Sequence, residues 1–144
     1  VGASQIFGWV LTREGIPQMI ATWSVNNIHN QTMFMLAVCL ILFFTGMFID
    51  AVPSMLIMAP LLCPAVEMYG IDMVHFGVVM VIMICIGLVT PPVGLNLFVA
   101  SSVGGVPVHK IIPHLMALIV ALVVGVIILV FLPQLSVWLP YLLK

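Results

Sequence analysis

The feature of this sequence that most limits its fold is an apolar run over residues 73–103 that is interrupted by the segment TPPVG at 90–94. Pro91 and Pro92 carry no backbone N–H, and a proline inside a helix costs about 3 kcal/mol because its ring clashes with the preceding turn. Inside hydrocarbon, every backbone group without a partner adds a further penalty. We therefore predict a discontinuous transmembrane helix over 73–103 that is broken at 90–94.

Composition places the chain in a membrane. Charged residues make up 5% of the sequence, whereas a soluble domain has about a quarter, so they cannot cover a water-exposed surface. We therefore expect an all-α polytopic membrane protein surrounded by the lipid bilayer. The net charge of −1 and the lack of a Lys/Arg cluster exclude nucleic acid as a partner. The cysteines, Cys39, Cys63 and Cys85, lie in apolar runs and are expected to be core or lipid-facing residues.

Length and polarity divide the rest of the chain into segments. We predict the end of a transmembrane helix at 1–12, an amphipathic interfacial connector at 13–32, a C-terminal transmembrane helix at 108–132 and a tail at 133–144. Tryptophan is enriched at membrane interfaces, so Trp9 and Trp23 are expected to lie at the headgroups. Because the first segment resembles a cut helix, we expect the C-terminal part of a longer protein.

Two apolar stretches, 33–49 and 51–66, flank an isolated carboxylate at Asp50. As helices they would be roughly 24 to 26 Å long, slightly less than a hydrocarbon core of about 30 Å. This pattern predicts a re-entrant helical hairpin over 33–66. Two short spans joined by a loop at Asp50 remain an alternative.

The predicted break releases backbone carbonyls that need partners other than lipid. In secondary transporters, unwound carbonyls coordinate Na⁺ and the N-terminus of the following half-helix faces an anion. Gly94 would let the chain re-enter a helix, and the side-chain oxygens of Thr90 and Asn96 suit a hard cation. The sequence therefore predicts a Na⁺ site at the break. The alternative is a proline kink that only shapes packing.

Asp50 is the second unusual feature, because a carboxylate at the bilayer centre costs about 2.5 to 3.5 kcal/mol on insertion scales. If the residues from Thr45 to Ser54 form a hairpin tip that meets the break, its carboxylate could neutralise Na⁺. It could instead hold the tip through hydrogen bonds from backbone N–H groups. An ordinary surface turn is the third possibility.

No residue pattern typical of catalysis occurs in the sequence. Zinc spacings such as H-E-x-x-H and the nucleophile motif G-x-S-x-G are both absent. The histidines His75, His109 and His114 lie near the ends of predicted spans, where histidine is common. We therefore expect neither an enzyme nor an organic cofactor.

Two long segments resemble a known family. The segments GMFIDAVPSMLIMAPLLCPAV (46–66) and GIDMVHFGVVMVIMICIGLVTPPVGLNLFVAS (70–101) resemble the C-terminal half of the large membrane subunit of tripartite ATP-independent periplasmic (TRAP) transporters. The upstream ASQIFGWVLTREGIP (3–17) fits the same family. The resemblance implies the ion transporter superfamily fold, with this chain as the second repeat of an inverted-repeat elevator transporter.

The resemblance also implies a function: sodium-coupled import of small carboxylates and other organic anions across the bacterial inner membrane. Na⁺ would be the coupling ion. The implied partners are a small membrane subunit, a periplasmic substrate-binding protein and the first repeat of the large subunit. A polytopic membrane scaffold without its own ion site is the alternative.

Motif reasoning and resemblance together lead to one set of predicted site residues. The expected Na⁺ site comprises Gly46, Asp50, Gly87, Thr90, Pro91, Pro92 and Gly94, and the expected substrate contacts are Ser54, Val93 and Asn96.

Overall fold

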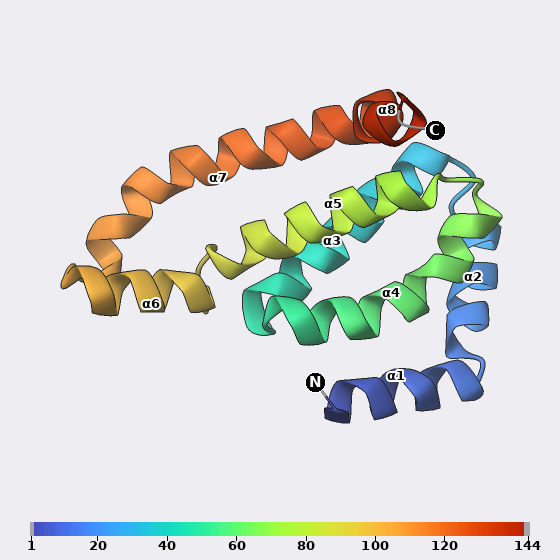
Figure 1. Cartoon of the computed structure of the whole chain (residues 1–144), viewed down its shortest axis with the longest axis horizontal. Helices are drawn as coiled ribbons and strands as arrows, with labels where there is room; N and C mark the ends of the chain where they lie inside the picture. The colour runs from blue at the N-terminus through green and yellow to red at the C-terminus, as the bar shows by residue number, and fades with distance from the viewer. Residues whose placement is uncertain (1, 143–144) are drawn as a thin grey trace.

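The computed structural model describes residues 2–142, so Val1 and the last two residues of the predicted tail lie outside it. The described chain is built from helices, as Figure 1 shows. Their bounds are α1 Gly2–Arg13, α2 Ile16–Asn27, α3 Gln31–Phe48, α4 Ala51–Met68, α5 Met73–Leu88, α6 Leu95–Gly104, α7 Val108–Phe131 and α8 Gln134–Leu142.

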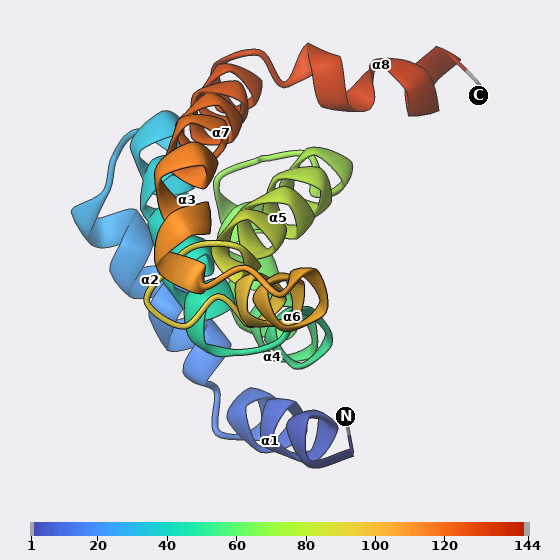
Figure 2. The same ribbon diagram turned by 90° about the vertical axis from the view of Figure 1, so that its left-hand side faces the viewer.

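Helix α5 is the centre of the packing. It contacts both α3 and α4, while α7 lies across α3 and α5 (Figures 1 and 2). Val38 and Leu42 of α3 and Val79 and Ile84 of α5 are among the least exposed side chains of the core. Because hydrocarbon is as apolar as these side chains, close van der Waals packing holds such helices together in a membrane.

The hairpin predicted over 33–66 corresponds to α3 and α4, which are joined at residues 49–50. Each helix has 18 residues, or about 27 Å at 1.5 Å per residue. Both are long and apolar enough to cross a membrane, as is α7. Their lengths suit a re-entrant hairpin or two spans, so the re-entrant arrangement remains a prediction.

Helix α2 forms most of the segment predicted as an interfacial connector. It packs against α4 and buries a face of small residues, Pro17, Ala21 and Ser24. The bulky Met19 and Trp23 are exposed instead. Small side chains let two helices approach closely, which explains why this face, and not the bulky apolar one, meets the protein.

Tyr69, just after α4, joins the helical hairpin to α2. Its hydroxyl lies 2.8 Å from the carbonyl oxygen of Ser24 and also within hydrogen-bond range of the Ile28 carbonyl. Its ring stacks on Phe34 with 4.2 Å between the centroids. Burial raises the pKa of the Tyr69 phenol, so the hydroxyl stays protonated and can donate. This contact spans more than forty residues of sequence.

We expect Tyr69→Phe to lower the free energy of unfolding by about 0.5 to 1.5 kcal/mol, because the hydrogen bond from the phenol to a part-buried carbonyl is lost while the stacked ring remains. Thermal unfolding of the complete large subunit in detergent measures the loss. The control is Thr22→Val, which removes an exposed hydroxyl that donates to the Gln18 carbonyl and should change the stability much less. Equal stability of Tyr69→Phe and the wild type would contradict the role of this contact.

The segment predicted as a tail contains helix α8. Its Ser136 hydroxyl lies 3.0 Å from Nδ1 of His75, in the first turn of α5. His75 is buried, and Asp72 caps this end of α5 by accepting from the backbone N–H groups of Val74 and His75. The end of the described chain is thereby tied to the start of the central helix.

Candidate functional site

Helices α3 and α5 touch through their backbones at two glycines. A Cβ atom built on Gly46 would lie 2.5 Å from the Ile84 carbonyl oxygen, and one on Gly87 would lie 2.6 Å from the Phe43 carbonyl oxygen. Real Cβ atoms do not approach backbone atoms so closely, so both positions need glycine. The crossing brings the end of α3 beside the end of α5.

The chain leaves helical geometry directly after this crossing, between the end of α5 at Leu88 and the start of α6 at Leu95. The Thr90 backbone N–H donates to the Gly87 carbonyl at 2.9 Å, and the Thr90 hydroxyl donates to the Ile86 carbonyl at 2.6 Å. Thr90 is 7% exposed. Among the hydrogen bonds of residues 2–142, none is accepted by the carbonyls of residues 89–93. These oxygens are therefore candidate ligands for an ion.

Gly94 closes the break and returns the chain to a helix. It has φ of 52° as the N-cap of α6, a left-handed conformation that favours glycine. Its N–H donates to the Met47 carbonyl at 3.4 Å. This long hydrogen bond places the break against the last turn of α3, three residues before Asp50.

Asp50 lies in the hairpin turn, and Ser54 lies in the first turn of α4. Asp50 is exposed, and its Oδ1 accepts from the Ala51 N–H at 2.8 Å as the N-cap of α4. Ser54 is fully buried, and its hydroxyl lies 3.4 Å from the Ile49 carbonyl oxygen. A hydrogen bond from a backbone N–H to Asp50 is the kind of contact that the bracing role would use. A role as a sodium ligand remains a prediction.

The predicted site residues fall into three groups. Gly46, Gly87, Thr90 and Gly94 meet at the crossing and the break. Asp50 lies in the neighbouring hairpin turn, and Ser54 lies in the first turn of α4. The remaining residues differ in exposure: Pro91 and Val93 are half-buried in the break, Pro92 is exposed there, and Asn96 is exposed in the first turn of α6.

The sequence did not reveal the part played by main-chain groups of α3. The carbonyls of Phe43 and Met47 contact Gly87 and Gly94, yet every residue has a carbonyl, so no side-chain pattern marks them. The only sign in the sequence of the close contact between α3 and α5 is one glycine in each helix, Gly46 and Gly87.

The donors gathered at the break are oxygen atoms: backbone carbonyls and the Thr90 hydroxyl. Oxygen donors are those that hard cations prefer, so the residues present fit a Na⁺ ion. The N-terminus of α6 adds the positive end of a helix dipole, which favours an anion nearby. Binding of a cation beside a negatively charged group at this place remains a prediction.

Comparison with known proteins assigns the chain to a family. The sequence model for the DctM component of the tripartite ATP-independent periplasmic transporter matches residues 1–135. The chain is 40% identical over 140 residues to the C4-dicarboxylate TRAP transporter large permease protein DctM of Pseudomonas aeruginosa, covering 97% of this chain and 33% of that protein. It is 36% identical over 135 residues to the sialic acid TRAP transporter large permease protein SiaM of Vibrio cholerae, covering 94% of this chain and 32% of that protein.

The chain thus spans about a third of the length of these relatives. The family match confirms the resemblance seen in the two long motifs, and it agrees with an apolar, helical structure that carries candidate membrane spans. This chain belongs to the DctM, or large permease, family of tripartite ATP-independent periplasmic transporters.

Proposed function

We propose that this chain contributes a Na⁺ site and part of the substrate cavity to a sodium-coupled importer of small carboxylates and other organic anions. The main support is the break between α5 and α6, where the carbonyls of residues 89–93 accept no hydrogen bond from the described chain. Such oxygens are stable inside a membrane only if protein, water or an ion compensates them.

The opposite charges of Na⁺ and a carboxylate substrate would couple their binding. A cation held by the break oxygens and by Thr90 would offset the charge of a carboxylate substrate at the N-terminus of α6. Ser54, Val93 and Asn96 would line the substrate side. Substrate and Na⁺ would then stabilise each other's binding, which is the energetic requirement for coupled transport.

The complete transporter would need further parts. The first repeat of the large subunit would supply the opposing hairpin and break, as in an inverted-repeat elevator mechanism. A small membrane subunit would brace the scaffold in the bacterial inner membrane, and a periplasmic binding protein would deliver the substrate. The names of the relatives, a sialic acid and a C4-dicarboxylate permease, support an organic anion as cargo.

The test is Thr90→Val in the complete transporter reconstituted into liposomes. Valine keeps the side-chain shape but removes the oxygen, so the Na⁺ concentration for half-maximal uptake is expected to rise about tenfold, as for losing one bond to a charged group. The matched control is Thr12→Val, since the Thr12 hydroxyl makes the same type of bond, to the Gly8 carbonyl at 2.9 Å, on α1. An unchanged Na⁺ dependence in Thr90→Val would remove Thr90 from the site.

A further inference from the structure

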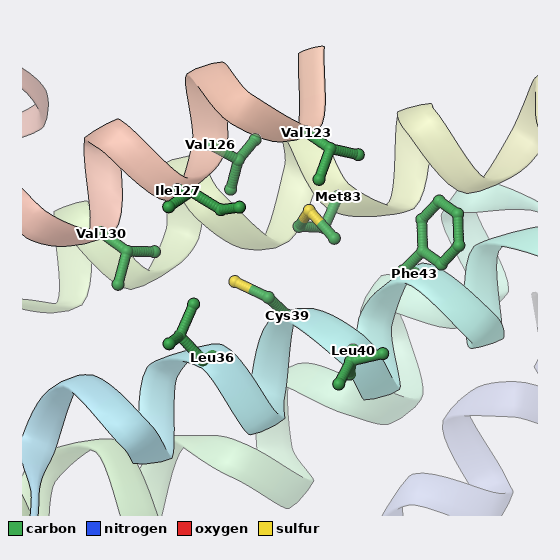
Figure 3. Close-up of a pocket in the computed structure, with 9 residues that line it drawn as sticks. All are labelled: Leu36, Cys39, Leu40, Phe43, Met83, Val123, Val126, Ile127 and Val130. Atoms are coloured by element: carbon green, nitrogen blue, oxygen red, sulfur yellow. The ribbon is translucent and has the colours of Figure 1, made fainter. Parts of the chain in front are cut away.

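The surroundings of α7 change from apolar to polar at its C-terminal end. An apolar cavity of about 490 Å³ lies between α3, α5 and α7, and Figure 3 shows its apolar and cysteine side chains converging from the facing helices. Val130, in the last turn of α7, lines this cavity and also a second cavity of about 310 Å³. Gln31, Thr32 and His75 contribute polar side chains to the second cavity. Because polar groups are costly in hydrocarbon, this change indicates that the hydrocarbon region ends close to Val130.

The length of α7 leads to the same boundary. Its 24 residues measure about 36 Å at 1.5 Å per residue, slightly more than a hydrocarbon core of about 30 Å. Val124, Ile128 and Phe131 lie on one side of α7 and are exposed. An apolar surface suited to lipid therefore extends to the last residue of the helix.

Helix α8 begins at this boundary and leaves the direction of α7. It starts at Gln134, three residues after Phe131, and three residues of chain reach at most about 10 Å. In Figure 1 α7 runs across the view and α8 is seen end-on, whereas in Figure 2 α8 runs across the view and α7 is foreshortened. If α7 crosses the bilayer, α8 therefore lies along the bilayer surface.

Helix α8 has an apolar face that points away from the protein. Its sequence, QLSVWLPYL, contains no charged residue. Leu135, Trp138 and Leu142 are spaced as neighbours on one helix face and are 61%, 63% and 67% exposed. On another face, the Ser136 hydroxyl lies 3.0 Å from Nδ1 of His75 in α5. One side of α8 thus contacts α5, and the apolar side has no cover from the described chain.

We propose that α8 is an interfacial anchor, a helix that lies in the plane of the membrane with Leu135, Trp138 and Leu142 inserted below the lipid headgroups. Lipid is the occupant of this face because α8 starts where the apolar surface of α7 ends, and because tryptophan is enriched at that depth. With nine residues, α8 is too short to cross the bilayer. The contact between Ser136 and His75 then holds the start of α5 at the membrane surface.

Photo-crosslinking identifies what covers the apolar face of α8. The complete large subunit and its small membrane partner are reconstituted into liposomes of phosphatidylethanolamine and phosphatidylglycerol, with p-benzoylphenylalanine in place of Trp138. Mass spectrometry after irradiation is expected to find a phospholipid attached at this position. The same replacement at Ile128, which is exposed on α7, is the positive control for contact with lipid.

A charged variant tests the apolar face directly. Leu135→Asp, combined with the crosslinker at position 138, should lower the yield of the phospholipid adduct about tenfold, because the face loses a large apolar side chain and gains a charge. Gln134→Asp is the matched control. It adds the same charge at an exposed position that is already polar, in the first turn of α8, where a negative charge is favourable, so the yield should not change.

Three results would overturn the proposal. The first is capture of the small subunit, in place of lipid, at position 138, which would make this face a protein interface. The second is a phospholipid adduct at position 128 without one at position 138. The third is an equal yield of the adduct in Leu135→Asp and in the protein with the native Leu135.

Discussion

Replacing Pro91 and Pro92 together by alanine is expected to abolish the sodium dependence of uptake by the complete transporter. Each alanine restores a backbone N–H, which can reach the carbonyl four residues earlier, at Gly87 and Leu88. Alanine also removes the penalty of about 3 kcal/mol that proline imposes on a helix interior. Helix α5 should then continue past Leu88, and the oxygens proposed to hold Na⁺ would become internal helix acceptors.

Measuring uptake at saturating and at limiting Na⁺ concentrations distinguishes this outcome from a lower amount of folded transporter. We expect residual transport, if any, to be independent of the Na⁺ concentration, with normal assembly of the large and small subunits. Pro113→Ala is the control, because Pro113 is an exposed proline in α7, outside the break. Wild-type sodium dependence of the double variant would support a membrane scaffold whose prolines only bend a helix.

Gly87→Ala is expected to be strongly destabilising. The added Cβ would lie 2.6 Å from the Phe43 carbonyl oxygen and 2.8 Å from two backbone atoms of Gly46. Backbone cannot rotate away as a flexible side chain can, so α3 and α5 must move apart. Overpacking of this kind costs about 1 to 3 kcal/mol, and separation of the helices would also weaken the hydrogen bond between Gly94 and Met47.

The matched control for this prediction lies in the same helix. A Cβ on Gly77 meets nothing within 4 Å, so Gly77→Ala should be neutral or should stabilise α5 by up to about 1 kcal/mol. Thermal unfolding of both variants in detergent gives the comparison. Equal unfolding temperatures for Gly87→Ala and Gly77→Ala would show that the two backbones are not in the close contact described.

Much of the architecture could be predicted because it depends on local chemistry. Apolar length and scarce charge predicted a helical membrane protein, and the structure and the family match agree. The TPPVG segment predicted an interruption at 90–94, and helices α5 and α6 lie on either side of that segment. Proline lacks a backbone N–H donor and glycine permits positive φ whatever surrounds them. This pattern can therefore be interpreted from the sequence before the fold is known.

The motifs around the break and the hairpin also identified the family, which the comparisons confirm. The predicted site residues were harder to arrange. Sequence reasoning considered a hairpin tip around Asp50 that meets the break. The structure shows a contact between the Gly94 N–H and the carbonyl of Met47 and a cap of α4 by Asp50, and the role of Asp50 at a Na⁺ site remains a prediction. Every residue carries a backbone carbonyl, so residue identity does not reveal which carbonyls will accept a contact from another helix.

Contacts between distant segments were decided by the tertiary structure alone. The face of α2 that packs on α4, the Tyr69 bond to Ser24 and the His75 bond to Ser136 join residues whose types are unremarkable in their own segments. Local polarity and helix breakers act within a turn or two of the chain, so they determine where helices begin and end. Which backbones then touch depends on the packing of whole helices, and that packing brings the proposed ion site together.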